Sequence, residues 1–66
     1  MNVELLKEKI AKSGIARTAI AAALDMSIPT FYNRLSGERE FKASEIRELT
    51  KVLKLSDSER NIIFFD

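Results

Sequence analysis

A chain of 66 residues with neither cysteine nor histidine has few routes to a stable fold. A domain of this size buries only about 60% of the surface that its unfolded chain exposes, and many small domains compensate with disulfides or a structural metal. Disulfides need cysteine, and structural zinc is bound by cysteine and histidine. We therefore expect no metal or cofactor, and expect stability to come from apolar packing, with or without a second subunit.

The apolar pattern is helical along the whole chain. Only two glycines and one proline interrupt it, and apolar residues recur three or four positions apart instead of alternating with polar ones. We predict one all-α domain over residues 1–66, with short helices at 3–13, 17–24, from Ser27 to Ser36-Gly37, 43–53 and 57–64. The expected inward positions are Val3, Leu6, Ile10, Ile20, Ala21, Leu24, Phe31, Leu35, Phe41, Ile46, Leu49, Val52 and Leu53.

The predicted helix boundaries carry residues that suit helix ends. Asn2, Ser27 and Ser56 can each accept hydrogen bonds from free amides at a helix N-terminus. Glu59, three residues after Ser56, completes the pattern of a capping box. Gly14 can end the first helix in the left-handed conformation. The boundaries are thus supported by local chemistry as well as by periodicity.

The charge distribution favours a nucleic-acid partner only weakly. The net charge is +1, and residues 7–42 hold seven Lys/Arg against four Asp/Glu, whereas residues 43–66 hold four against five. An ordinary solvated surface explains this bias equally well. The longest apolar run, residues 19–24, is far shorter than the ~20 residues of a membrane span, and residues 1–12 are too charged for a signal peptide. We expect a cytoplasmic protein, which the lack of cysteine also fits.

Catalytic chemistry is difficult to build from this composition. Without histidine there is no Ser-His-Asp arrangement, and without cysteine there is no thiol nucleophile. Neither glycine belongs to a GxGxxG or P-loop pattern. Every carboxylate has a Lys or Arg nearby at helical spacing, as on an ion-paired surface. We therefore expect neither enzyme activity nor a small-molecule ligand.

The most informative segment is the pair of helices around Asp25-Met26-Ser27. A helix of about eight residues, a three-residue turn and a second helix make a helix-turn-helix unit. Asp25 tolerates the left-handed backbone that such a turn needs, and Ala21 is small enough for the helices to approach closely. The apolar residues expected to fix the angle between the helices are Ile20, Leu24, Phe31 and Leu35.

Residues 15–37, IARTAIAAALDMSIPTFYNRLSG, resemble the helix-turn-helix of the XRE family of phage regulators, which includes Cro and the phage repressors. The likeness continues through FKASEI at 41–46 and the fourth helix to Phe64-Phe65. It implies a lambda-repressor-like fold of five helices, with the motif at about 17–36. The chain departs from the family at Ala16, usually a Ser or Thr cap, at Asp25, usually Gly, and at Ile28-Pro29, where polar residues are common.

The resemblance implies that the third helix enters the major groove of double-stranded DNA. The expected base contacts are Ile28, Pro29, Tyr32 and Asn33. The amide of Asn33 can pair with an adenine edge, and Ile28 and Pro29 could touch a thymine methyl group. The expected phosphate contacts, which set affinity and salt dependence rather than sequence, are Arg17, Thr30, Arg34, Ser36, Arg39 and Lys42.

Several of these residues have simpler interpretations. Ile28 could belong to the core, because it precedes Phe31 by three positions. The ring of Tyr32 could stack on Arg17 or Arg39 instead of contacting DNA. Asn33 could be an ordinary surface residue.

The resemblance implies a sequence-specific transcriptional regulator that binds a two-fold operator as a homodimer. The last helix ends in Ile62-Ile63-Phe64-Phe65, more apolar surface than a closing turn needs, so we expect part of it to support the dimer. The alternative is a protein-interaction module on the same fold, such as an antitoxin or a docking partner.

Overall fold

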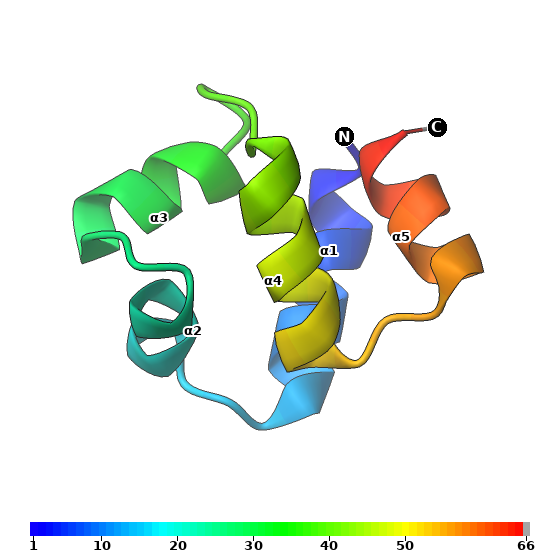
Figure 1. Ribbon diagram of the computed structural model, residues 1–66, viewed down its shortest axis with the longest axis horizontal. Coiled ribbons are helices and arrows are strands. Elements are labelled where there is room, and N and C mark those ends of the chain that lie inside the picture. The colour runs from blue at the N-terminus through cyan, green and yellow to red at the C-terminus, as the bar shows by residue number, and fades with distance from the viewer. Residues whose placement is uncertain (66) are drawn as a thin grey trace.

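The computed structural model describes residues 1–65, which form five helices joined by short connections (Figure 1). These are α1 (Val3–Ser13), α2 (Arg17–Ala23), α3 (Ile28–Leu35), α4 (Ala43–Leu53) and α5 (Asp57–Phe64). None of the described residues forms a strand. The prediction of an all-α chain with five helices is confirmed, and the predicted bounds differ from the observed ones by about one residue.

The N-termini of α1, α3 and α5 are closed by the residues that the sequence indicates, whereas Ala16 before α2 has no capping side chain. Asn2 Oδ1 accepts a hydrogen bond from the Leu5 amide at 3.1 Å, and Ser27 Oγ accepts one from the Thr30 amide at 3.2 Å. At α5, Ser56 Oγ accepts from the Glu59 amide at 3.0 Å, and Glu59 Oε1 accepts from the Ser56 amide at 2.8 Å. Each bond satisfies an amide that has no partner within its helix.

Left-handed backbone occurs at two helix ends that carry a side chain. Asp25 has φ 55° in the turn between α2 and α3, as expected. The turn is closed by the Met26 amide, which donates to the Ala21 carbonyl at 3.1 Å. Lys54, which follows α4, has φ 54°, and nothing in the sequence indicates this conformation, because lysine has no special tolerance for it.

One apolar core lies between the five helices. Its buried members are Leu6, Ile10, Ile20, Ala21, Leu24, Phe31, Leu35, Phe41, Leu49, Leu55 and Ile63. Four expected core residues, Val3, Ile46, Val52 and Leu53, are only partly buried. Leu55 was not expected in the core and lies there because the chain turns back after Lys54. Ile46, Val52 and Leu53 nevertheless pack against the core from its edge, so their predicted inward positions are confirmed.

Three aromatic rings connect α3 to α5 through the core. The rings of Phe31 and Phe41 meet edge to face with centroids 6.4 Å apart, and those of Phe41 and Phe64 with centroids 5.9 Å apart. This geometry suits the quadrupoles of aromatic rings. Phe41 therefore holds the loop between α3 and α4 against the body, as its predicted inward position requires.

The arrangement separates two sides of the molecule. In Figure 1, α2 and α3 lie on the left, and α5 and the N-terminus lie on the right, with α1 and α4 between them. The Asn2 amide donates to the Ile63 carbonyl at 2.7 Å, which joins the first residues to α5. In the part that the structure describes, no helix is both long enough and apolar enough to cross a membrane.

Candidate nucleic-acid interface

Helix α3 presents one face to the core and the other to solvent. Phe31 and Leu35 are buried and lie four residues apart on the inner face. Ile28 and Tyr32 are each 45% exposed. Helical spacing places both at the border of the inner face, whereas Pro29 and Asn33 point further from the core. The interpretation of Ile28 as a core residue is therefore wrong. The four residues expected to contact bases, Ile28, Pro29, Tyr32 and Asn33, are all exposed.

The structure brings Arg17 of α2 next to Tyr32 of α3. The guanidinium carbon of Arg17 lies 5.5 Å from the centroid of the Tyr32 ring, which is cation–π distance. The simpler interpretation of Tyr32, in which its ring stacks on Arg17, is therefore confirmed, and a base contact by Tyr32 stays a prediction. An expected phosphate contact thus lies directly beside an expected base contact, although the two residues are fifteen positions apart in the sequence. The contact also limits the freedom of the long Arg17 side chain, so its charge stays close to the exposed face of α3.

Arg34 is engaged within the protein. Its Nε donates to Glu45 Oε1 at 3.2 Å, and both side chains are only 15% exposed. The same carboxylate oxygen accepts from the Lys42 amide at 2.8 Å. Burial alone would raise the pKa of Glu45, but these two hydrogen bonds outweigh it and the pKa lies below its usual range. Arg34 therefore joins α3 to the start of α4, and its expected phosphate contact would compete with this pair.

Glu45 holds Arg34 and the Lys42 backbone in place, and nothing in the sequence singled it out. It lies eleven positions from Arg34, so helical spacing does not connect them. A weaker signal was available, because a glutamate at the third position of a helix often accepts from the amide that precedes the helix. The position before α4 is Lys42, an expected phosphate contact, so Glu45 also fixes the backbone of that residue.

Both hydroxyl groups expected at phosphates already have partners. Ser27 Oγ donates to Thr30 Oγ1 at 2.9 Å. Ser36 Oγ donates to the Asn33 carbonyl at 3.0 Å and accepts from the Glu38 amide at 3.4 Å. Thr30 and Ser36 thus shape the two ends of α3, and a phosphate contact by either would add to or replace these bonds.

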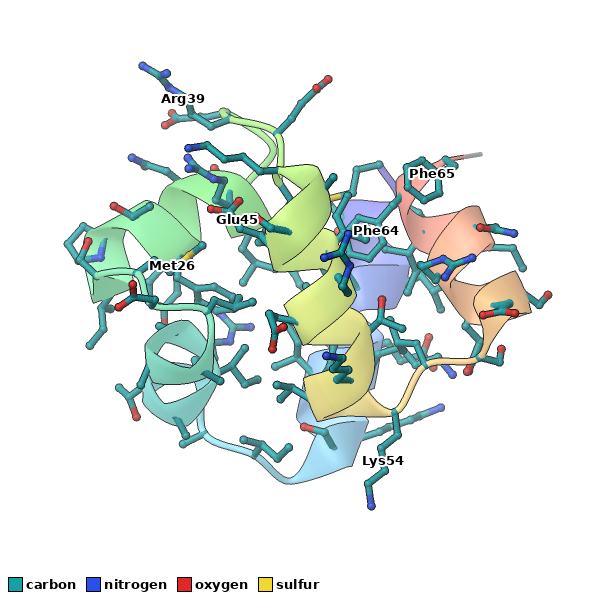
Figure 2. All side chains as sticks on the ribbon, in the orientation of Figure 1. Met26, Arg39, Glu45, Lys54, Phe64 and Phe65 are labelled. Atoms are coloured by element: carbon teal, nitrogen blue, oxygen red, sulfur yellow. The ribbon has the colours of Figure 1, made fainter. Side chains whose placement is uncertain are left out.

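The loop after α3 carries charges of both signs. Arg39 is exposed and projects away from the body at the tip of the loop (Figure 2). Lys42 is exposed where the loop enters α4. Glu38 and Glu40 flank Arg39 and are also exposed, so the loop presents two cations and two carboxylates. This balance agrees with the small net charge and would moderate the attraction of the loop for a polyanion.

The charges elsewhere are mostly paired within or between helices. Lys9 of α1 is bonded to Glu59 of α5, and Lys12 lies 2.9 Å from Glu8. The hydrogen bond from Lys9, followed by those from Ser56, lowers the pKa of Glu59 to about 2. Within residues 1–65, no three acidic side chains come close enough to hold a metal ion. Lys7, Arg47 and Lys54 also have no ion pair among the described residues, so Arg17, Arg39 and Lys42 are distinguished by their position beside α3.

Comparison with known proteins gives no relative from which the role of this site could be inferred. No family model matches the chain. No similar protein is found among curated proteins or solved structures. The likeness to the XRE family accordingly remains an expectation from the sequence.

Proposed function

We propose that this protein is a sequence-specific DNA-binding regulator of the helix-turn-helix type, with a lambda-repressor-like arrangement in which α3 enters the major groove. The observation that carries the proposal is the pairing of Arg17 with Tyr32 beside the exposed face of α3. A cation held at the edge of an exposed helix can bind a phosphate while the helix reads bases in the groove. Arg39 and Lys42 would contact the backbone on the other side of α3.

The direct test is selection from a pool of random double-stranded DNA, followed by a salt titration on the selected sequence. A two-fold symmetric consensus, with half-sites about one helical turn (~34 Å) apart, would support a dimeric regulator. A linear fall of log K with log salt would support phosphate contacts. Binding without any consensus would overturn sequence specificity, and no binding at 50 mM salt would overturn the DNA-binding proposal.

The homodimer is part of this proposal. Ile62 and Phe65, at the end of α5, are 43% and 66% exposed. Phe65 borders two hollows of about 370 and 380 Å³, and Ile46 lines both. Charged residues also line these hollows, Arg39 and Glu40 the first and Arg47, Lys51 and Arg60 the second. The exposed apolar side chains beside them favour contact with a second copy. Sedimentation at ~0.1 mM should give a dimer that Phe65→Ser dissociates, and a monomeric mass at that concentration would contradict it.

The second candidate is a protein-interaction module, which the exposed carboxylates Glu38 and Glu40 and the exposed apolar end of α5 both favour. Stoichiometric co-purification with another protein, together with no DNA selection, would support this function. If the protein binds both DNA and a partner protein, the same DNA consensus should be selected with and without the partner.

A further inference from the structure

A second cluster of cations lies between α4 and α5, apart from the exposed face of α3. Arg47, Lys51 and Arg60 line the hollow of about 380 Å³, together with Ala43, Ile46, Thr50 and Phe65. The α4 members recur three or four positions apart, so they form one stripe along that helix. In Figure 1, α4 and α5 lie at the centre and right, whereas α3 lies at the left. The candidate DNA interface therefore makes no use of these cations.

The two cations on α4 are weakly engaged within the described chain. Arg47 is exposed and has no ion pair there. Lys51 lies 3.6 Å from Glu48, and both of these side chains are largely exposed to solvent. Exposed pairs of this kind contribute little free energy. Both cations are thus available to an anionic partner.

Arg60, on α5, has hydrogen-bonding capacity to spare. Its guanidinium lies 3.5 Å from Asp57, whose side chain is 91% exposed, and donates to Asn61 Oδ1 at 3.3 Å. Its Nε is buried and has no hydrogen-bond partner within residues 1–65. An arginine side chain has five N–H groups, and a carboxylate can accept two of them at once. A carboxylate in the hollow would give this guanidinium a partner that the described residues do not provide.

The surface between the cations is apolar. Ile46 is half-buried, and Phe65 is 66% exposed. A volume of about 380 Å³ is at the small end of ligand sites, which span about 300–1,000 Å³. Such a hollow suits one large apolar side chain rather than a whole helix. The fitting occupant therefore carries an apolar group next to two or more carboxylates.

Neither a second copy of this chain nor a DNA duplex suits this hollow. In a two-fold contact the same surface meets itself, so a dimer centred here would bring the three cations of each copy together. The other hollow, with Arg39 and Glu40, carries one charge of each sign and suits a second copy better. A concave surface cannot enter a groove of DNA, so Ile46 and Phe65 would meet only sugars and phosphates.

We propose that the hollow between α4 and α5 binds an acidic segment of another protein. The segment inserts one apolar side chain against Ile46 and Phe65 and places carboxylates on Arg47 and Arg60. This site is separate from the exposed face of α3, so it binds such a segment whether or not the chain binds DNA. Phe65 also borders the first hollow, so the segment and the proposed second copy would compete for this side chain.

The test selects peptides on the purified full chain from a displayed library of short random sequences. We expect a consensus of one large apolar residue next to at least two Asp or Glu residues. A synthetic consensus peptide should lose about 10- to 100-fold in affinity when its apolar residue is replaced by alanine, because a large buried side chain is lost. Its binding should also weaken as salt rises. Selection of no peptide, or of peptides without acidic residues, would overturn the inference.

Variants of the chain locate the bound peptide. Arg47→Gln and Arg60→Gln should each weaken binding by about 2- to 5-fold, as for partly exposed ion pairs. Arg47 is exposed, so its variant should keep the circular dichroism of the parent even if Arg60→Gln destabilises α5. Lys7→Gln, on the exposed side of α1, is the matched control and should leave the affinity unchanged. A loss with Arg17→Ala as large as that with Arg47→Gln would place the peptide on α3 and overturn the inference.

A competition experiment distinguishes a protein partner from a nucleic acid. Random single-stranded DNA is added to the complex of the chain with the consensus peptide, and it should not displace the peptide. Displacement that Arg47→Gln abolishes would make the hollow a nucleic-acid site and overturn the inference. Peptide binding without selection of any duplex DNA would instead overturn the proposed DNA-binding function and leave this site intact.

Discussion

At the scale of single residues, the candidate interface depends on which of its cations have no partner within the protein. Arg34 is held by Glu45, and Arg39 and Lys42 lie in the loop after α3, whereas Arg17 stacks directly on Tyr32 of α3. Its stacking on Tyr32 orders the guanidinium before any ligand arrives. Ordering a long side chain in advance lowers the entropy lost on binding.

We predict that Arg17→Ala weakens binding to all DNA sequences alike and reduces the slope of log K against log salt by about one unit. Lys51→Ala, at an exposed position late in α4, is the matched control and should leave the slope unchanged. Asn33→Ala should behave differently, with a loss of about 1–3 kcal/mol on the selected site only. Equal losses on selected and random DNA for both variants would contradict the division of roles.

Removal of a carboxylate beside Arg39 should strengthen DNA binding, which is opposite to the effect expected for Arg17→Ala. Glu40→Gln removes a negative charge from the loop while keeping its size, so binding to DNA should become stronger by about 2- to 5-fold at low salt and by less at high salt. Glu4→Gln, at an exposed position of α1 without an ion pair among the described residues, serves as the control for net charge alone. If both variants strengthened binding equally, the loop would have no special place in the interface.

At the scale of the helices, local chemistry decided what could be predicted. The start of α1, α3 and α5 followed from Asn2, Ser27 and Ser56, because capping acts within three residues of the helix end. The ion pairs Arg34–Glu45 and Lys9–Glu59 join residues 11 and 50 positions apart. They depend on how the helices are placed in space, which no short-range pattern encodes.

The candidate site, like the fold, was predictable where it depends on helical periodicity and not where it depends on contacts between helices. The outward face of α3 followed from its helical period, and Arg17 beside Tyr32 was one of the two stacking arrangements that the sequence left open. The engagement of Arg34 and Ser36 was not predictable. A cation and a hydroxyl near a helix end look equally free in a sequence, and only the positions of Glu45 and the Glu38 amide show that they have partners.

The inner face of α3 gives an element-scale prediction. Leu35 is buried between α3 and its neighbours, so Leu35→Ala should lower the free energy of unfolding by ~2–5 kcal/mol through lost contacts and the cavity that remains. Ser36→Ala, at the exposed residue that follows Leu35, is the control and should lower the free energy of unfolding much less. A thermal midpoint unchanged by Leu35→Ala would show that α3 does not pack as described.

The end of α4 offers a stabilising change. Lys54 holds φ 54° with a side chain that gains nothing there. Glycine adopts this conformation without steric cost and is the preferred residue after a helix. We expect Lys54→Gly to raise the free energy of unfolding by about 0.5–1 kcal/mol, measured by thermal or urea denaturation. Lys54→Ala retains the Cβ atom and should give no such gain.

At the scale of the whole molecule, two carboxylates connect helices that are distant in sequence. Glu59 joins α5 to α1, and Glu45 joins α4 to α3. Both have pKa values below the ordinary 4.5, that of Glu59 near 2. Their charged forms are therefore more favourable in the folded protein than in the unfolded chain.

This difference predicts acid sensitivity. The contribution of the two carboxylates is fully present above about pH 4.5 and is lost as the pH falls towards 2, because protons then bind the unfolded chain more tightly than the folded one. Thermal midpoints by circular dichroism should decline over this range. Lys9→Met should make the decline shallower. A midpoint that stays constant from pH 7 to pH 3 would contradict the assigned ion pairs.

The hydrogen bond between Asn2 and Ile63 has a consequence for engineering. Residues near the two ends of the described chain lie side by side, on the side of the molecule away from α2 and α3 (Figure 1). A short peptide could bridge them and close the backbone into a ring, and new ends could then be opened between Gly37 and Lys42. Such a circular permutant would keep the core and cut only the loop beside α3, which would separate the contribution of that loop to recognition from its contribution to folding.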